Sequence, residues 1–322
     1  MAREIITVFG GSGFLGRNVV RELARAGYRI RVAVRKPHEA HFLQPLGGVG
    51  QISLQAVNIR DERSVERALD GASGAVNLVG ILYQGGKQRF RALHAEAPGR
   101  IGRLATGKGL ERVIHISSIG ANPRSPSRYA RTKAAGERAL REQFPQATIL
   151  RPSIMFGPED GFFRRFAAMA ALPGLVAPVL PLMGGRTKFQ PVHVDDVADA
   201  VVTCLRDAHT AGRIYELGGP EVLTFREWME LMLEVIERKK PLMPVPMFMA
   251  RIMGFFMGML PNPPLTLDQV RQLKIDNVVR PGGEENVGTI QDLGIQPTAA
   301  EVILPTYLWR FRPRGQYADY HT

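Results

Sequence analysis

The feature that most constrains this chain is a glycine-rich loop between a predicted strand and a predicted helix. Residues 5–9 are mostly apolar and β-branched, which predicts a buried strand, and 17–26 has helical spacing. In such a unit the first glycine allows a tight turn, and the middle one lets the backbone approach a pyrophosphate. The last lets the helix pack closely on the strand.

Phosphates bind at the N-terminus of such a helix, where free amides and the helix dipole favour anions. Glycines alone also occur in ordinary turns, so the flanking strand and helix carry the prediction of a dinucleotide site. The predicted cofactor contacts in the loop are Gly10, Gly11, Ser12, Gly13, Phe14, Leu15, Gly16 and Arg17.

Apolar strands alternate with amphipathic helices through the first half of the chain. Later strands are predicted at 30–34, 52–57, 75–78, 112–116 and 148–150, and helices at 63–69, 92–106 and 129–143. Such alternation predicts a Rossmann-type α/β fold with a doubly wound parallel sheet. Ligands of these sheets bind at the carboxyl ends of the strands. The further cofactor contacts predicted at those ends are Leu78, Val79, Gly80, Ile116, Ser117, Pro152, Ser153 and Ile154.

The pattern changes after residue 152. Glycine and proline become frequent over 156–185, which indicates loops and short elements. A strand or turn feeding a helix is expected over 192–205, a strand at 214–217 and a helix at 224–238. We therefore predict a dinucleotide-binding core over 1–152 and a smaller C-terminal lobe and tail over 153–322, with 186–218 returning to the core.

The charge of the chain indicates which kinds of partner to expect, and its cysteine content indicates the compartment. The chain has 42 lysines and arginines against 30 acids, a net charge of +12, which attracts nucleic acid, anionic lipid or an acidic partner. It shows no nucleic-acid module, so a membrane surface or a protein partner is favoured. Cys204 is the one cysteine, which excludes an intrachain disulfide. We expect no signal or transit peptide, because no long apolar or Arg/Ser-rich stretch precedes Ile5; a bacterial cytoplasmic origin is expected, with a processed organellar chain as the alternative.

The end of the second strand indicates which nicotinamide cofactor binds. NAD-binding members of this fold place an acid about twenty residues after the glycines, whereas NADP-binding members commonly place an arginine there. Here Arg35 and Lys36 follow the strand, and Arg17 can join them. The pattern favours NADP(H); the alternative is that both are solvated charges. Asn58 and Ile59 are predicted at the adenine edge, with a turn role as the alternative for Asn58.

A tyrosine and a lysine four residues apart suggest proton-transfer chemistry. Tyr129 and Lys133 share one face of a predicted helix. Because an adjacent cation favours a phenolate, Lys133 is expected to lower the tyrosine pKa and to hold the nicotinamide ribose. Ser118, after the strand at 112–116, would polarise a carbonyl. These three are the candidate catalytic residues, although such a pair also arises by chance on helices.

Together these residues resemble a short-chain dehydrogenase/reductase of the extended or atypical kind. Within that family the chain looks most similar to the NADPH-binding accessory subunit of respiratory complex I, alpha-subcomplex subunit nine, and its bacterial relatives. The resemblance implies a tightly held NADPH and a structural role beside the core subunits, at the junction of the peripheral and membrane arms. It rests on the glycine pattern and on 77–80, 117–118, 127–137, 151–160, 190–197 and 265–270.

One departure from the enzyme pattern affects the predicted activity. Only eleven positions separate Ser118 from Tyr129, and 119–123 replaces a longer segment found in sugar-nucleotide epimerases. Proton transfer needs these hydroxyls within hydrogen-bond reach of the substrate. We therefore expect an accessory subunit with a relic triad and little turnover. The alternative is an NADP-dependent reductase, epimerase or dehydratase acting on a carbonyl or nucleotide-sugar substrate; a scaffold that senses the NADP(H) ratio is a third hypothesis.

A methionine-rich apolar run, 247–260, is charged only at Arg251. Six of the twelve methionines lie between Met243 and Met259. A bilayer span needs about twenty apolar residues, so this run is too short to cross. It is either a helix at a membrane interface or on a membrane partner, with Arg251 reaching headgroups, or a buried helix of the small lobe. A helix at a membrane interface or on a membrane partner would place the chain peripherally on the cytoplasmic side of the bacterial inner membrane. An anionic lipid surface is a candidate contact there.

His193, with Asp195 and Asp196 after it, has the composition of a metal site. No matching ligand spacing occurs elsewhere, so we predict a structural turn opening a helix and no metal.

Overall fold

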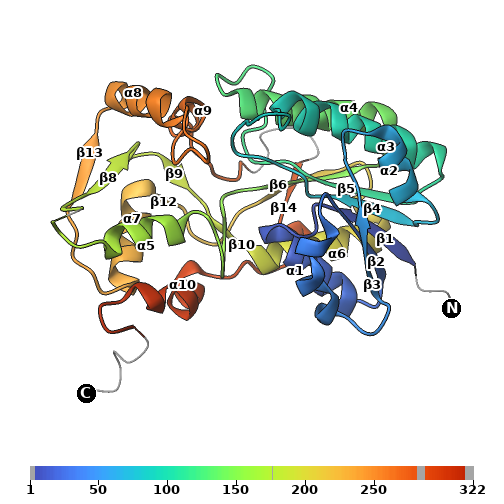
Figure 1. Ribbon diagram of the computed structural model, residues 1–322, viewed down its shortest axis with the longest axis horizontal. Coiled ribbons are helices and arrows are strands. Elements are labelled where there is room, and N and C mark those ends of the chain that lie inside the picture. The colour runs from blue at the N-terminus through green and yellow to red at the C-terminus, as the bar shows by residue number, and fades with distance from the viewer. Residues whose placement is uncertain (1–3, 176, 281–286, 316–322) are drawn as a thin grey trace. The chain divides into compact units, whose positions relative to one another are not determined.

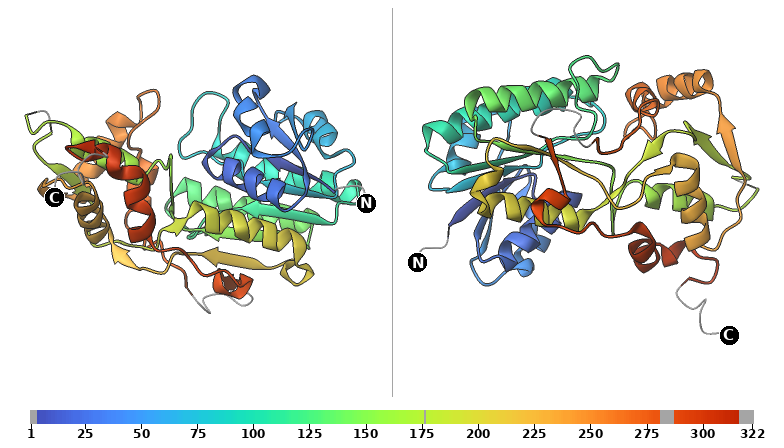
Figure 2. Two further views of the ribbon diagram at one scale, coloured as in Figure 1. Left: turned by 90° about the horizontal axis from the view of Figure 1, so that it is seen from below. Right: turned by 180° about the vertical axis from the view of Figure 1, so that it is seen from behind.

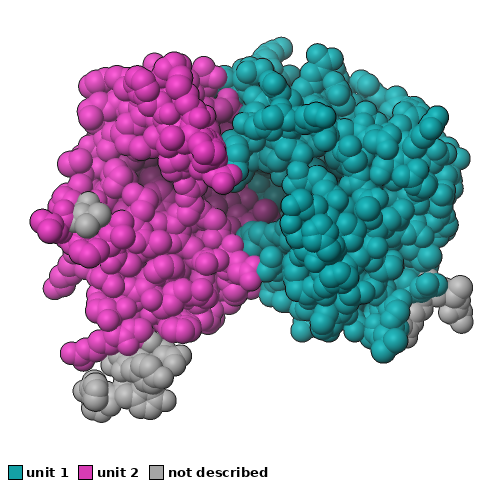
Figure 3. Space-filling model, viewed as in Figure 1, with its two compact units in different colours: residues 1–152, 194–217, 280–296 teal, residues 153–193, 218–279, 297–322 magenta. Residues whose placement is uncertain are grey.

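The computed structural model describes residues 4–175, 177–280 and 287–315. The chain divides into two compact units, coloured separately in Figure 3. Unit 1 comprises Met1–Pro152, Val194–Leu217 and Arg280–Gln296, and unit 2 comprises Ser153–His193, Gly218–Val279 and Pro297–Thr322.

Unit 1 is built on a parallel sheet (Figure 1). In the described part of the chain this sheet has eight strands in the order β14-β11-β6-β5-β4-β1-β2-β3. The direction of winding reverses between β1 and β4, which defines the switch point where such sheets bind ligands. The predicted doubly wound parallel sheet is confirmed. The strands are β1 (Ile5–Phe9), β2 (Arg29–Val34), β3 (Ile52–Ala56), β4 (Gly74–Asn77), β5 (Arg112–Ile116), β6 (Thr148–Pro152), β11 (Ile214–Leu217) and β14 (Val287–Thr289).

Helices cover both faces of this sheet (Figures 1 and 2). α1 (Phe14–Arg25) packs beside α6 (Val194–Arg206) on one face, and α2 (Glu62–Leu69), α3 (Ala97–Gly107) and α4 (Arg128–Gln143) cover the other. A π-helical segment, η3 (Arg91–Glu96), leads directly into α3. The short 3-10 turns of unit 1 are η1 (Pro37–Glu39), η2 (His41–Leu46), η4 (Ala208–Thr210) and η5 (Gln291–Leu293).

Two later segments of the chain complete unit 1. We expected the chain to return to the core over 186–218; the returning segment is Val194–Leu217, which supplies α6 and β11. A second return, Arg280–Gln296, adds the edge strand β14, whose residues pair in parallel with β11. With only three residues, β14 has no periodicity of its own, and its pairing with β11 makes it a strand.

Unit 2 is assembled from short strands and helices around an aromatic core. Phe156, Phe163, Phe189, Phe225 and Trp228 are buried together, and the Trp228 indole donates to the Phe189 carbonyl at 3.1 Å. Its strand pairs are β7 (Met155–Phe156) with β10 (Val192–His193), β9 (Lys188–Phe189) with β12 (Leu223–Thr224), and β8 (Leu180–Met183) with β13 (Leu242–Val245). Its helical segments are α5 (Phe163–Ala171), α7 (Phe225–Val235), α8 (Met247–Met257), α9 (Leu267–Gln272), α10 (Ala300–Leu308) and η6 (Trp309–Phe311).

The helix α8 corresponds to the methionine-rich run and packs against α9 (Figure 1). Its buried residues are Ala250 and Gly254, and most of its large apolar side chains are exposed. Of the two alternatives for this run, the buried helix of the small lobe is therefore wrong. The apolar content of the run could not distinguish the alternatives, because apolar residues occur on most of the helix circumference.

Candidate functional site

The glycine loop joins β1 to α1 and forms a cradle of backbone. Gly10 has φ +82°, a left-handed conformation that favours glycine, and its amide donates to Ala33 O at 3.1 Å. A Cβ on Gly16 would lie 2.4 Å from Gly10 O, so the helix approaches the loop too closely for any side chain there. Gly13 is exposed, and a Cβ on it would meet only Gly10 O, at 3.4 Å. Glycine thus permits both the left-handed turn and the close helix contact, while the outer side of the loop stays open to a ligand.

The start of α1 offers an anion site. Its N-cap is Gly13, which has no side chain to bond the first helical amides, and its first turn is not acidic. Arg17 lies in that turn with its guanidinium carbon 4.9 Å from the Phe42 ring centroid, and burial lowers the pKa of Arg17. Unbonded amides, the helix dipole and this arginine together fit a phosphate group. The residues present therefore fit a dinucleotide.

At the end of β2, Arg35 and Lys36 are both exposed. Lys36 is already paired: its Nζ lies 2.6 Å from Glu39 Oε1, and this bond lowers the pKa of Glu39. After β3, the Asn58 side chain accepts from the Arg60 amide at 3.2 Å, which is a turn contact, while Ile59 is buried. Lys36 is thus engaged within its own turn, and Arg35 carries the second exposed positive charge at this strand end.

Ser118, Tyr129 and Lys133 are brought together in unit 1. Ser118 follows β5, and the other two lie one turn apart at the start of α4, where Ser127 caps the helix through the Ala130 amide. The Ser118 hydroxyl lies close enough to the Tyr129 phenol to lower its pKa. Yet Ser118 Oγ is buried without a partner of hydrogen-bond geometry among the described residues. A buried hydroxyl of this kind fits a ligand carbonyl or hydroxyl.

The expected effect of Lys133 on Tyr129 is not observed. Burial raises the pKa of Tyr129, and its effect exceeds that of the Ser118 hydroxyl. Lys133 Nζ lies 5.9 Å from the Tyr129 ring centroid and donates to Ile116 O at 3.0 Å. Burial also lowers the pKa of Lys133 to about 8, against an opposing effect of Glu137. The phenol therefore keeps its proton at neutral pH and is suited to act as a proton donor.

A buried histidine beside the tyrosine was not predicted. His94 lies in the π-helical segment η3, and its ring meets the Tyr129 ring edge-on with centroids 5.2 Å apart. Its Nε2 accepts from the Ile81 amide at 3.0 Å, so the neutral ring carries its proton on Nδ1, which faces Thr132 Oγ1 at 3.4 Å. Burial and the Lys133 charge lower the pKa of His94 to about 2. A neutral imidazole therefore supports the tyrosine ring.

A second histidine, His115, lies beneath the site on β5. Its Nδ1 accepts from Asn77 Nδ2 at 3.1 Å, and Asn77 Oδ1 accepts from the Val79 amide at 3.2 Å. Burial, followed by the Lys133 charge, lowers the pKa of His115 to about 3. This pair fixes the chain as it leaves β4 towards Gly80, where a Cβ would lie 3.5 Å from Lys133 Nζ.

A buried ion network also escaped prediction. The Glu137 carboxylate accepts from Arg151 Nε at 3.0 Å and from Arg151 Nη2 at 2.7 Å, and the Ser117 hydroxyl donates to the same carboxylate. Arg151 Nη1 lies 3.8 Å from Glu216 Oε1 on β11. The network ties α4 to β5, β6 and β11 and so holds Tyr129 and Lys133 in place. Its one sequence signal was the spacing of Glu137, four residues after Lys133 on the same helix face.

The remaining predicted contacts fall in different places. Leu78 and Val79 are partly buried and Gly80 is exposed after β4, while Ile116 and Ser117 are buried at the end of β5. Pro152 ends β6 in unit 1, but Ser153 and Ile154 belong to unit 2. There the Ser153 hydroxyl and the Ile154 amide lie 2.7 and 3.3 Å from Asn277 Oδ1.

Other kinds of site find less support. In the described residues no three His, Cys, Asp or Glu side chains gather as a metal site would require, and no helix there has the length and apolarity of a membrane span.

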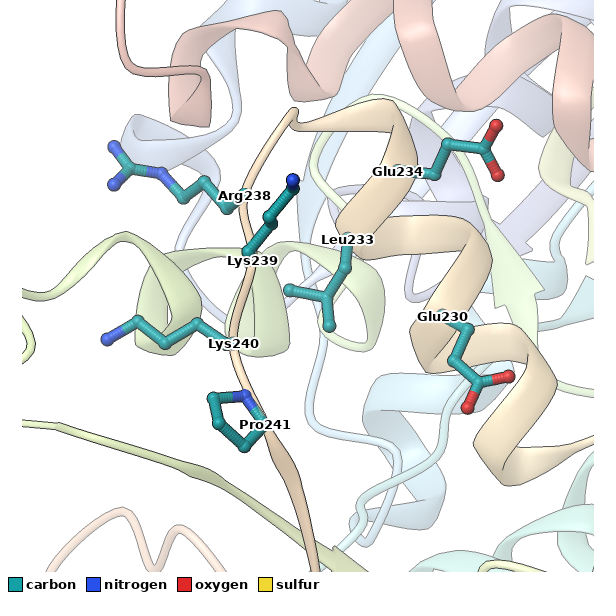
Figure 4. Close-up of a pocket in the computed structure, with 7 residues that line it drawn as sticks. All are labelled: Glu230, Leu233, Glu234, Arg238, Lys239, Lys240 and Pro241. Carbon is teal, nitrogen blue, oxygen red and sulfur yellow. The ribbon is translucent and has the colours of Figure 1, made fainter.

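An open pocket of about 450 Å³ in unit 2 is lined by the end of α7 and by residues 238–241 (Figure 4). Glu230 and Glu234 point away from that segment, and Lys240 donates to Leu172 O at 2.8 Å. The polar groups that line this pocket do not point toward a common ligand position.

The fold and this site define a protein of the nicotinamide-dinucleotide-binding class. The chain belongs to the NAD dependent epimerase/dehydratase family, whose model matches residues 6–218. A nucleoside-diphosphate-sugar epimerase from Staphylococcus aureus shares this fold, with a TM-score of 0.72 over 93% of this chain and 99% of that one, at 15% identity.

Relatives in sequence are more specific and confirm the predicted resemblance. The chain is 34% identical to NADH dehydrogenase [ubiquinone] 1 alpha subcomplex subunit 9 of Arabidopsis thaliana, over 97% of this chain and 79% of the relative. It is 31% identical to the Mus musculus protein of that name, over 92% and 78%. A ceramide reductase of Caulobacter vibrioides is 31% identical over 64% of this chain and 62% of its own length.

Proposed function

We propose that this protein is an NADP(H)-holding subunit of a respiratory NADH dehydrogenase, complex I, with little turnover of its own. The observation that carries the proposal is the identity of 34% and 31% to subunits of that enzyme over more than nine tenths of the chain. The open cradle at Gly13, the uncapped start of α1 and Arg17 support a resident dinucleotide.

The test is native mass spectrometry of complex I purified in mild detergent from membranes of the source organism. The expected spectrum contains this chain in stoichiometric amount with a bound nucleotide. Complex I that holds its large core subunits but lacks this chain would contradict the proposal. We also propose contact near the junction of the peripheral and membrane arms, on the cytoplasmic side of the bacterial inner membrane; crosslinks from this chain to subunits of both arms test that placement.

The preference for NADP(H) over NAD(H) rests on Arg35. A guanidinium can pair with a 2′-phosphate through two hydrogen bonds, and Lys36 is already engaged by Glu39. Arg35→Glu should weaken NADPH binding at least about tenfold and leave NADH binding nearly unchanged, as measured by calorimetry on the purified chain. Arg67→Glu on α2, also exposed, is the matched control. Equal loss for both nucleotides would exclude a 2′-phosphate contact.

A second candidate is an NADP-dependent reductase of a carbonyl compound. It is favoured by the buried, unpartnered Ser118 Oγ beside a phenol that stays protonated, an arrangement that can polarise a carbonyl and donate a proton to it. The bound nicotinamide would supply the hydride, and Lys133 would hold its ribose. The Caulobacter vibrioides relative favours a lipid substrate over a nucleotide sugar.

Turnover separates the two candidates. Tyr129→Phe removes the proton donor and keeps the ring against His94, so a reductase should lose at least about a hundredfold in kcat with NADPH still bound. Thr106→Val, a matched removal of a hydroxyl remote from the triad, should retain activity. If wild-type protein with bound NADPH oxidises none of it in the presence of ceramide-like ketones, the holding role is favoured.

A further inference from the structure

The helix α8 has the reverse of the usual burial pattern of a surface helix. Its large apolar side chains, Phe248, Ile252, Phe255 and Phe256, have exposed fractions between 49% and 64%. Its small residues, Ala250 and Gly254, are buried against α9, where a Cβ on Gly254 would lie 3.1 Å from Leu267 N. A helix that only filled the core of unit 2 would turn its large side chains inward.

The exposed side chains of α8 form one continuous face. At 100° per residue, positions 248, 252 and 255 lie on one line of the helix surface and 249 and 256 on the neighbouring line. All five are exposed, and so are Met259 and Leu260, which follow the helix. Monomeric proteins seldom expose a contiguous apolar patch of this kind unless it binds something. This apolar face of α8 therefore requires a partner.

The charges around the apolar face select the partner. Arg251 is exposed at its flank, and Arg165, also exposed, donates to Pro264 O at 2.9 Å in the segment after α8. Residues 238–267 contain four basic residues and no acid. Asp268, the first acid after them, lies 3.7 Å from Arg271 and is largely buried. Apolar side chains bordered by cations fit a bilayer surface with anionic headgroups.

We propose that α8 lies in the interface of an anionic bilayer, with Phe248, Ile252, Phe255 and Phe256 among the acyl chains and Arg251 among the phosphates. The helix has 11 residues, which makes it about 16 Å long, so it lies along the surface. Gly254 and Ala250 let α9 hold it closely on the side away from lipid. This deepens the peripheral location proposed above by naming the element that makes the contact.

Vesicle binding by the full chain tests the proposal. Wild-type protein should sediment with phosphatidylcholine vesicles that contain a quarter phosphatidylglycerol, and binding to pure phosphatidylcholine should be weaker by about fivefold or more. Phe255→Ser with Phe256→Ser should reduce binding at least about tenfold. The matched control, Val222→Ser with Val302→Ser, removes two exposed apolar side chains of unit 2 that lie outside α8 and should bind as wild type.

A depth measurement distinguishes insertion from adhesion. Wild type already contains Trp228 and Trp309, so the fluorescence added by each variant is compared with it. The fluorescence added by Phe256→Trp should be quenched by bromine atoms near the headgroup end of the lipid chains, whereas that added by Val302→Trp should not. Equal loss of binding in the control pair, or equal quenching at both positions, would overturn the proposal. The proposal would also be overturned if wild-type protein bound neither kind of vesicle and bound to membranes only through a membrane protein. A failure of vesicle binding would not change the expected co-purification with complex I, so each proposal can be contradicted without the other.

Discussion

The helices α1 and α8 have nearly the same length, 12 and 11 residues, and opposite arrangements of side chains. α1 buries Leu15, Val19, Val20 and Leu23 and exposes Arg25, whereas α8 buries Ala250 and Gly254 and exposes its phenylalanines. Burial of a large aliphatic side chain contributes about 1.5–3 kcal/mol, so α1 stabilises unit 1 while the apolar face of α8 contributes little to unit 2. The first helix is built to support a site within the fold, and the second to meet a surface outside it.

The largest expected effect is at the closest contact of α1. Gly16→Ala places a Cβ 2.4 Å from Gly10 O and 2.6 Å from Gly11 Cα, both backbone atoms of the cradle. We expect the free energy of unfolding to fall by roughly 4 kcal/mol and nucleotide binding to be lost. Denaturant unfolding and calorimetry measure these two quantities. Gly107→Ala, where a Cβ meets nothing within 4 Å, is the matched control.

The next prediction concerns the buried face of α1. Leu23 is fully buried, so Leu23→Ala should lower the free energy of unfolding by about 3 kcal/mol. The nucleotide should still bind to the folded fraction, because Leu23 is two turns away from the cradle. An effect below about 1 kcal/mol would mean that α1 does not support unit 1 in the way that its burial pattern indicates.

The buried histidines beneath the site predict acid sensitivity of unit 1. Folded His94 and His115 have pKa values lowered to about 2 and about 3, against 6.5 for the ordinary side chain. Between pH 6.5 and these values the unfolded chain binds protons that the folded chain does not, so stability falls as the pH falls. Below about pH 5.5, where an unfolded histidine is almost fully protonated, each of the two should contribute a slope approaching 1.4 kcal/mol per pH unit.

The acid prediction is checked by denaturant unfolding at pH 7, 6 and 5, comparing wild type with His94→Gln. Glutamine can still accept from the Ile81 amide but does not titrate, so the variant should lose about half of the histidine contribution to the slope. His38→Gln, which removes an exposed histidine side chain, is the matched control. An unchanged slope in His94→Gln would contradict the prediction, because it would mean that His94 takes up its proton over the same pH range in the folded chain as in the unfolded chain.

The difference between α1 and α8 also shows which parts of the fold could be predicted from the sequence and which could not. The β1–α1–β2 unit and the strands β3 to β6 were predictable because each is a local run with one clear period. Strand β14 and the Glu137–Arg151 bridge depend on which strands become neighbours, which no local pattern specifies. The π-helical turn that carries His94 has no sequence signal of its own.

The candidate site was predictable to a similar extent. Ser118, Tyr129 and Lys133 could be placed together because strand ends and helix faces follow from local pattern. The protonation state of Tyr129 could not be predicted, since its pKa depends on the balance between burial, which raises it, and the opposing effect of the Ser118 hydroxyl. The orientation of α8 was equally undetermined, because its composition is apolar on both sides and only the contact with α9 selects the buried one.

The smallest expected effect completes the comparison of α1 with α8. Phe255→Ala removes a larger side chain than Leu23→Ala does, yet its exposed position predicts a change of less than about 0.5 kcal/mol in the free energy of unfolding. Gly254→Ala, on the buried side of the same helix, should cost more than Phe255→Ala, because its Cβ would meet Leu267 N and Thr266 C at 3.1 Å. Unfolding of both variants in the absence of lipid measures this order. A loss at Phe255 as large as that at Leu23 would mean that the apolar face of α8 is covered by protein in solution, and the bilayer would no longer be needed to explain it.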